Sequence, residues 1–479
     1  MEPVTKASDV RRRTAALVLS GSVLLALAGG LVRVGLPSIR RDLSAGIAAM
    51  QAVSMAGLVV TTATVVAFGH LADLMGARSV YAAGLVAFAA GYGVDAVAPS
   101  VGWLVAGQAV TGLGWAMCVG SGAALLVSTF EATERGRILS AHLTANALGM
   151  AAGPGLGGLV VQGAGWRLGL AMLIPPALLL AALMVRSLPA RSNDSGDTAA
   201  RGAFDLIGAA SLAGALAGLV LLISGSGEAD LPHIRSPALM VVILVFGAVF
   251  VRAEMRAPRP LLDLRMFNVP GFSAGLGASF LNFIAMASNM FLMPFFLQDL
   301  LGESPSRAGL VMMAVPVAIA VFAPLAGVAT DRYGSRGPAT FGEGMVAAAV
   351  VLMAALGRES SLWSVASVLA LYGLGAAFFH SPNNSGVMGS APPDRAGVAA
   401  ASLGTFARIG EAAGVAIAGG LWRAGLEHNA TAPAGAEHAF QQAFLVLGAV
   451  GLVAALVSWS RGRAPRRQPM DPVEESGRR

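Results

Sequence analysis

A short charged segment that stands between two long apolar runs occurs twice in this sequence. The first copy runs from Gly69 to Arg78 and the second from Gly327 to Arg336, and each holds an aspartate, a glycine and an arginine in the same order. A chain that repeats such a loop at matching places is built from repeated units. The pattern therefore predicts two helical bundles of similar construction, each with a charged loop between its second and third helix.

The composition excludes a water-soluble globular protein. Hydrophobic residues make up 56% of the chain and charged residues 12%, about half the charged fraction of an average soluble protein. The mean hydropathy is +0.71. The single cysteine, Cys118, excludes an internal disulfide.

The net charge of +6 does not indicate nucleic-acid binding, because of where the charges lie. Most of the 32 Lys and Arg residues fall on one set of alternating loops between the apolar runs. This is the positive-inside asymmetry of a protein with many membrane spans. We therefore expect the chain to lie in the lipid bilayer and not to bind nucleic acid.

Fourteen apolar segments of about membrane-spanning length predict an all-α membrane protein. An even number of spans places both termini on one side, and Arg11 to Arg13 and Arg461 to Arg467 indicate that this side is the cytoplasm. The segments lie near residues 14–36, 45–68, 79–97, 102–128, 138–161, 167–186, 205–224, 237–252, 272–297, 308–329, 339–356, 362–381, 398–424 and 440–459.

A polar stretch at residues 191–197 indicates a flexible cytoplasmic linker that divides the chain. We expect an N-terminal six-helix bundle over residues 1–187 and a C-terminal six-helix bundle over residues 261–460. Residues 188–260 then hold the linker and two inserted transmembrane helices, and residues 461–479 form a cytoplasmic tail.

The repeated loop resembles motif A of the major facilitator superfamily. In that family an aspartate and an arginine flank a glycine turn, and the resemblance implies an ionic latch that holds one face of a transporter shut. An ordinary polar loop with cytoplasmic positive charge is the alternative interpretation. The matching residues are Gly69, Asp73, Gly76 and Arg78 in the first copy and Asp331 and Arg332 in the degenerate second copy.

The segment from Gly149 to Gly158 resembles motif C, which occurs in exporters of the same superfamily. Glycines one turn apart leave a groove without side chains in which another helix can pack closely. Pro154 removes a backbone hydrogen bond and kinks the helix. A generic packing face is the alternative to an exporter hinge and proton seal. The motif residues are Gly149, Gly153, Pro154, Gly157 and Gly158.

Further family-like stretches are Gly165 to Arg167, Pro260 to Leu264 and Arg408 to Gly414. With fourteen predicted spans, they resemble the fourteen-helix drug:proton antiporter branch, whose members export antiseptics, dyes and antibiotics. The resemblance implies a multi-pass protein of the bacterial inner (plasma) membrane with the major facilitator fold. Its expected partners are small amphipathic or cationic molecules and protons, and we expect a monomer.

The first bundle departs from the pattern of this branch at two positions that usually carry proton-coupling groups. The first predicted helix has Ala28 and Arg33 where an aspartate and an asparagine are usual, and the fourth has Gln108 where motif B supplies an arginine. We therefore expect Arg33 to pair with Asp95, with Gln108 nearby, as a displaced charge site. The alternative is that Arg33 reaches the outer interface and Asp95 is solvated.

In the helix predicted at 398–424, Arg408 and Glu411 are three residues apart and lie on one face. Glu411 falls near the middle of its span, which makes it the deepest carboxylate that the sequence offers and the first candidate for proton coupling. Placing a charged side chain within a membrane costs roughly 2.5 to 3.5 kcal/mol, so such a residue is expected to have a partner or a function. A structural salt bridge is the alternative. Glu343 is a weaker candidate that we expect near the surface.

Polar and methionine side chains recur at helical spacing in three predicted helices and predict the wall of a central cavity. Hydrogen bonding between helices, without any substrate contact, is the alternative for each of them. Methionines would give a soft wall suited to varied apolar cargo. The cavity candidates are Gln108, Thr111, Trp115, Asn146, Asn282, Met286 and Asn289.

No enzymatic or ATP-driven mechanism fits the sequence. The six histidines are scattered, no metal-ligand spacing or cofactor motif occurs, and the single lysine, Lys6, is not part of a phosphate-binding loop. We interpret the chain as a multidrug or antibiotic exporter that works by alternating access, coupled to protons. An uncoupled or dedicated exporter of one secreted metabolite is the main alternative, and a membrane sensor that transports nothing is the third.

Overall fold

The structure is a computed structural model that describes residues 2–131, 133–187, 211, 214–215, 218, 235–256, 264–392, 395–428 and 435–461. The described residues form helices and no strands. Nine of the described helices are long and apolar enough to cross a membrane.

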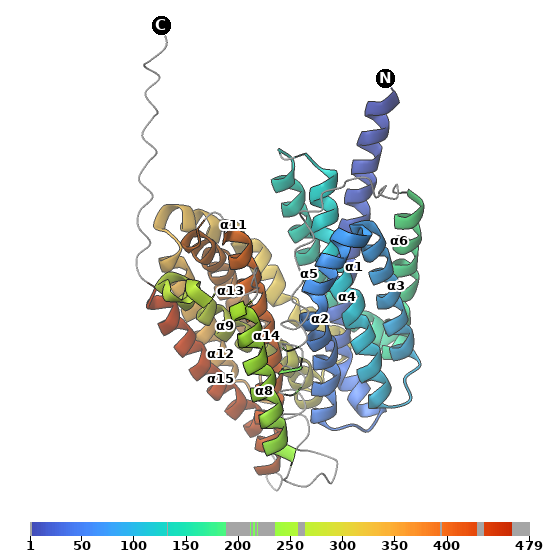
Figure 1. Cartoon of the computed structure of the whole chain (residues 1–479). Coiled ribbons are helices and arrows are strands. Elements are labelled where there is room, and N and C mark those ends of the chain that lie inside the picture. Colours follow the sequence, from blue (N-terminus) through green and yellow to red (C-terminus); the bar gives the residue numbers. More distant parts are fainter. Residues whose placement is uncertain are drawn as a thin grey trace, which may run out of the picture.

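The first bundle consists of six helices that run alternately up and down (Figure 1). Its tightest pairs are α1 with α5, α3 with α4, and α2 with α4. The helices are α1 (Glu2–Asp42), α2 (Ile47–Met75), α3 (Ala77–Ala96), α4 (Val101–Thr129), α5 (Arg135–Ala171) and α6 (Ile174–Ser187).

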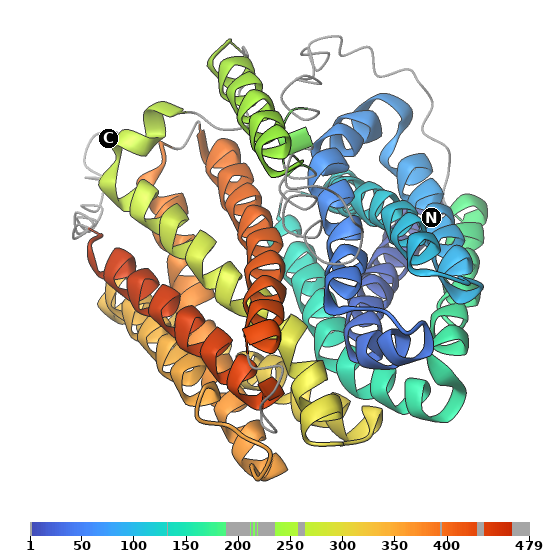
Figure 2. The same cartoon turned by 90° about the horizontal axis from the view of Figure 1, so that it is seen from below.

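The second bundle repeats these pairings, with α9 against α14, α12 against α13, and α11 against α13. The two bundles lie side by side when the molecule is seen along its helices (Figure 2). The helices are α9 (Pro270–Phe295), α10 (Pro305–Met312), α11 (Ala314–Tyr333), α12 (Arg336–Met353), α13 (Leu362–Ser390), α14 (Ala396–His428) and α15 (Gly435–Trp459), with short helical turns η2 (Leu264–Asn268) and η3 (Phe296–Leu300).

The predicted apolar segments correspond to these helices, with differences at two places. The helix α5 continues past the predicted break and turns at Gly165, whose φ of 78° is positive. The segment predicted at 308–329 is divided between α10 and α11. The linker at 191–197, most of the segment 205–224 and the tail after Arg461 lie outside the described residues.

Between the bundles in sequence lies α8 (Arg235–Arg256). Its Phe246 and Ile243 side chains lie against Gly214 and Gly218, where an added Cβ would approach them closer than 3.0 Å. These two glycines belong to the segment predicted as the other inserted helix. Fourteen transmembrane helices therefore stay a prediction, because only a few residues of that segment are described.

The repeated loop has the same backbone construction in both bundles. Gly76 and Gly334 have φ values of 88° and 76°, in the region that favours glycine, and each ends one helix just before the next begins. Arg78 then donates hydrogen bonds to the carbonyls of Met184 and Val185 at the end of α6. In the second copy, Arg336 donates to the Trp459 carbonyl at the end of α15 at 2.7 and 3.0 Å. Each copy thus connects the third helix of its bundle to the last one.

Candidate functional site

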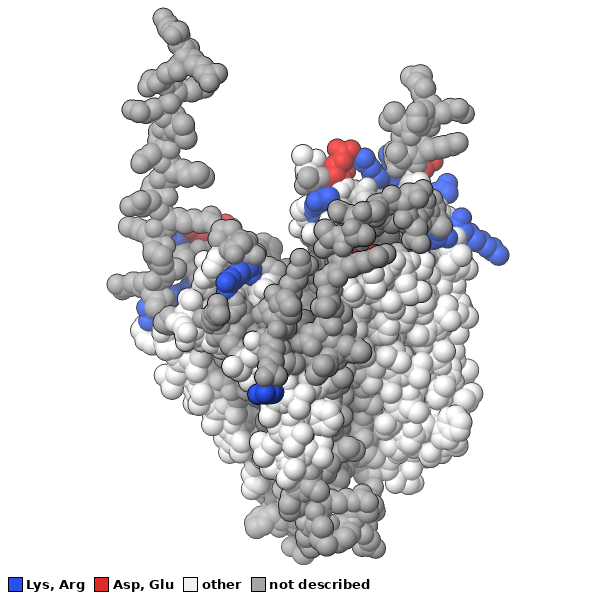
Figure 3. Space-filling view, in the orientation of Figure 1, with Lys and Arg blue, Asp and Glu red and all other residues white. Residues whose placement is uncertain are grey.

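The two bundles separate at the end of the molecule that carries both termini and meet at the opposite, distal end (Figure 1). In Figure 3 the Lys and Arg side chains gather at the end with the termini, and the flanks below it are mostly uncharged. Hydrogen bonds and an ion pair between described residues of the two bundles lie in the distal half of the helices.

Two adjoining pockets lie between the bundles. Both are lined by Arg33 of α1 and Met290 of α9, so together they form one central cavity. Methionine side chains make up much of the remaining wall, as the sequence predicts. They are Met150, Met286, Met293 and Met312.

The charged residues of the cavity belong to both bundles. Arg408 and Glu411 of α14 form an ion pair at 2.7 Å. The Arg408 guanidinium also lies 5.0 Å from the ring centre of Trp115 on α4, a cation–π contact that crosses from one bundle to the other. Arg33 lines the same space, and the charge of Glu411 attracts it, although no ion pair joins the two residues.

The expected pair between Arg33 and Asp95 does not form among the described residues. Asp95 is completely buried between α3 and α4 and accepts a hydrogen bond from Gln108 at 2.7 Å. An added Cβ at Gly107 would collide with the Asp95 carboxylate, so this glycine makes room for it. The sequence correctly placed Gln108 near Asp95, but Arg33 faces the other side, toward the second bundle.

Only some of the residues that were predicted to line the cavity do so. Met286 and Asn289 line the cavity, and Trp115 reaches Arg408. Asn282 is completely buried within the second bundle, and Thr111 is buried against Gly91 of α3. Gln108 donates a hydrogen bond to the Asp95 carboxylate, and Asn146 is half-buried on α5.

The second bundle contains a buried polar chain that the sequence only partly indicated. Asn282 of α9 donates to the Glu343 carboxylate of α12 at 2.8 Å, and its carbonyl oxygen lies 2.9 Å from Nε2 of His380 on α13. Phe283 stacks on the His380 ring. Glu343 was expected near the surface, but its side chain has no exposed area. That expectation was wrong because Gly342 lets α12 approach the α13 backbone closely and encloses its neighbour.

Arg461, assigned from the sequence to the charged tail, lies within the bundle. Its side chain is buried and donates to the Asn383 carbonyl oxygen on α13. The Glu343 charge acts on it through space. A basic residue after the last apolar run gives no sign of burial in the sequence.

The motif C glycines pack on two different helices. An added Cβ at Gly149 or Gly153 would approach the α1 backbone closer than 3.0 Å. Gly158 faces the other way, and its added Cβ would collide with the Pro305 carbonyl of α10. An added Cβ at Gly309 of α10 would likewise collide with the Pro154 carbonyl of α5. The helix α5 is therefore held between its own bundle and the other one.

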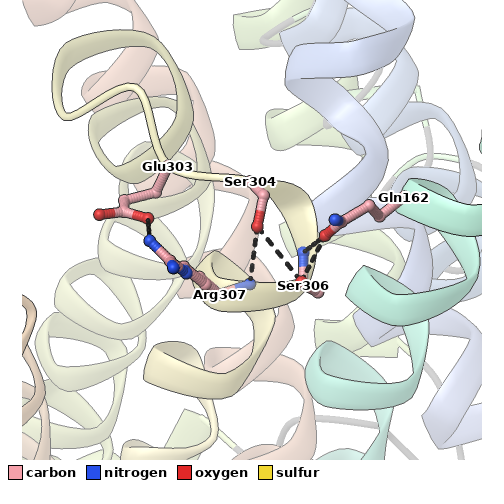
Figure 4. Close-up of polar contacts among 5 residues, drawn as sticks. All are labelled: Gln162, Glu303, Ser304, Ser306 and Arg307. Carbon is pink, nitrogen blue, oxygen red and sulfur yellow. Dashed lines mark hydrogen bonds and ion pairs between the residues drawn. The ribbon is translucent and has the colours of Figure 1, made fainter.

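Polar contacts surround this helix crossing at the distal end. Gln162 of α5 accepts hydrogen bonds from the backbone amide and the hydroxyl of Ser306 on α10 (Figure 4). Arg40 of α1 pairs with Asp299 at 3.0 Å, and Gln298 donates to the Val34 carbonyl at 2.9 Å. We call these contacts, together with the crossing of α5 and α10, the distal seal.

The motif A aspartates make no such contact. Asp73 and Asp331 are both exposed at the end that carries the termini, and neither has a hydrogen-bond or ion-pair partner among the described residues. The bundles are thus joined by contacts at the distal end, while these two aspartates at the end with the termini are exposed.

The family model described as the Major Facilitator Superfamily matches residues 18–279 and 275–478 of this sequence. The chain belongs to this superfamily. The fold is similar to that of two solved transporter structures. These are a nucleoside transporter, NupG, with a TM-score of 0.65 and 13% identity over 95% of this chain and all of that one, and a bacterial homologue of the lysosomal transporter Spinster, with a TM-score of 0.66 and 15% identity over 96% and 98%.

Relatives with known names are also major facilitator transporters. The riboflavin transporter RibZ of Clostridioides difficile is 25% identical over 86% of this chain and 88% of its own. The tetracenomycin C resistance and export protein of Streptomyces glaucescens is 28% identical over 87% and 77%. The multidrug efflux pump LfrA of Mycolicibacterium smegmatis is 29% identical over 90% and 85%. The family and these relatives indicate a membrane transporter rather than an enzyme.

Proposed function

We propose that this protein is a secondary transporter that exports small amphipathic molecules by alternating access. The observation that carries the proposal is the central cavity between two bundles that separate toward the termini and are joined at the other end by the distal seal. A motif C helix that forms part of this seal supports export, because the sequence resemblance associates that motif with exporters. Multidrug and antibiotic efflux by the relatives supports it further.

The orientation follows from the charge pattern. We place the end with both termini in the cytoplasm of the bacterial inner membrane, because Lys and Arg gather there. The cavity then faces inward, ready to take cargo from the cytoplasm. We retain the domain boundaries 1–187, 188–260, 261–460 and 461–479 and the fourteen-helix drug:proton antiporter branch as parts of this proposal.

Proton coupling requires a membrane carboxylate that gains and loses a proton during the cycle. Glu411 and Asp95 remain candidates, with Arg408 and Arg33 as the nearby cations, and the complete burial of Glu343 supports this weaker candidate of the sequence. All three carboxylates have a hydrogen-bonding partner, but only Asp95 and Glu343 also have an oxygen that is buried without one. The alternative is an uncoupled or dedicated exporter, which the riboflavin-transporting relative makes worth testing.

The test is transport by inside-out membrane vesicles that contain a pH-sensitive dye. We expect at least one amphipathic compound to accumulate in vesicles with this protein and not in vesicles without it, and to move protons in the opposite direction. Accumulation without any proton movement would establish the uncoupled exporter. A screen in which no compound moves, with the protein present at normal level, would contradict the transport function.

A second test concerns the motif A loop. We expect Asp73→Asn to lower transport at least tenfold without changing the amount of protein in the membrane. Asp73 is exposed and unpartnered here, so its charge can contribute only in the opposite conformation, where the end with the termini closes. Asp9→Asn is the control, because Asp9 is also exposed at this end. Equal transport by Asp73→Asn and the parent would rule out a latch.

A further inference from the structure

The central cavity carries an excess of positive charge. Among its described lining residues, Arg33 and Glu411 are the charged ones. Glu411 offsets only one of the two neighbouring arginine charges, because it forms the 2.7 Å ion pair with Arg408 and attracts Arg33 through space, so the three residues together carry one positive charge. Asp95, the nearest acidic residue in the first bundle, is buried behind the wall with Gln108. The guanidinium of Arg33 is therefore the charge that the cavity leaves available to cargo.

Arg33 is also placed to meet cargo from either part of the cavity. It lines both pockets, between Gly30 and Pro154 on one side and Glu411 on the other. It has neither an ion pair nor a hydrogen bond with any residue that the structure describes. Placing an arginine within the membrane costs free energy unless a group of opposite charge or a hydrogen-bond acceptor binds it. Its planar fork of donors fits the two oxygens of a carboxylate and also binds other oxyanions.

The rest of the wall fits a flat apolar body. Methionines adapt their shape to varied ligands, and four of them lie around Met290 on both bundles. Asn289 adds a polar side chain to the wall, although it is itself almost completely buried. Pro154 and Leu369 complete an apolar surface.

We propose that the cargo is an anionic aromatic amphiphile, a molecule with a flat apolar body and a carboxylate or acidic phenol that binds Arg33. This inference rests on the proposed export function and narrows it. It replaces lipophilic cations, which the sequence resemblance suggested, because the available charge of the cavity would repel them.

The experiment compares two dyes that share a ring system and differ in charge. Binding of fluorescein, an anion, and rhodamine 6G, a cation, is measured by fluorescence anisotropy with the purified full chain in lipid nanodiscs. Uptake of both dyes into inside-out vesicles is measured in parallel. We expect fluorescein to bind at least tenfold more tightly than rhodamine 6G, and to be taken up.

Three variants connect the preference to Arg33. We expect Arg33→Gln to weaken fluorescein binding at least tenfold, Arg33→Lys to retain part of it, and Arg33→Glu to reverse the preference between the dyes. Arg358→Gln removes an exposed arginine far from the cavity and should change neither dye. Thermal unfolding of each variant shows whether it is folded, and the reversal by Arg33→Glu cannot arise from a general loss of structure.

The outcomes separate the inference from the function. Fluorescein that binds through Arg33 but is not taken up would contradict export and leave the anion site standing. Uptake of rhodamine 6G without binding of fluorescein would overturn the anion site and leave export standing. Binding of neither dye, or fluorescein binding that is unchanged in Arg33→Gln, also overturns the inference.

Discussion

Gly158→Leu is expected to abolish transport while the protein still reaches the membrane. Even a Cβ at this position would collide with the Pro305 carbonyl, so a leucine forces α5 and α10 apart and the distal seal cannot close. Transport is measured in vesicles. The state of the seal is measured in whole cells, by labelling a Ser54→Cys reporter, a half-buried position in the cavity wall, with a membrane-impermeant maleimide. The native Cys118 is buried and does not compete.

We expect the reporter to be labelled several times faster in Gly158→Leu than in the parent, since the cavity then opens to the outside. Gly163→Leu is the matched control. It adds the same side chain to the same helix, and nothing lies within 4 Å of its Cβ position. If Gly158→Leu transports like Gly163→Leu, then the crossing of α5 and α10 does not close the cavity.

Glu343→Gln is expected to remove substrate-linked proton movement almost completely and to leave substrate binding in place. The carboxylate is completely buried, and one of its oxygens has no partner among the described residues. Gain or loss of a proton there changes the charge inside the bundle, where a charge costs roughly 2.5 to 3.5 kcal/mol. Through Asn282 the change reaches His380, so three helices respond to it. Glutamine keeps the shape and cannot titrate.

The comparison uses Glu411→Gln and Asp95→Asn beside it, with exposed Glu359→Gln as the control. Proton movement is followed with the pH-sensitive dye when substrate is added to vesicles. A parent-like signal from Glu343→Gln together with loss in Glu411→Gln or Asp95→Asn would assign the coupling to one of those carboxylates. Absence of a signal from the parent, for a compound that it exports, would favour the uncoupled alternative.

The helical fold was predictable because apolar runs of bilayer length leave the chain few choices. Within a membrane every backbone polar group must be satisfied by the chain itself, so such runs form helices. The glycines of the repeated loop were predictable for a local reason as well. A tight turn between two helices needs a positive φ at Gly76 and Gly334, and few other residues adopt it readily.

The polar contacts were harder to predict because they depend on how helices rotate against one another. Arg33 and Asp95 stand at the same depth in the sequence pattern, yet Arg33 lines the cavity and Asp95 is enclosed between α3 and α4. Glu411 was expected to be the deepest carboxylate, but it lines the cavity, and the fully enclosed ones are Asp95 and Glu343. The sequence shows which residues are polar, and only the packing of small neighbours such as Gly107 and Gly342 shows which become enclosed.

One contact between the bundles is expected to affect the rate of the transport cycle rather than the affinity for cargo. Gln51 of α2 is completely buried and donates to the carbonyls of Val415 and Ala416 on α14, each at 3.0 Å. These acceptors belong to the backbone, so the contact depends on the position of α14 and not on its side chains. If the bundles rock, both bonds stretch before water can replace them. They then raise the barrier between the two conformations, and each 1.4 kcal/mol of barrier slows the crossing about tenfold. We therefore expect Gln51, which does not itself line the cavity, to affect the turnover time of the cycle.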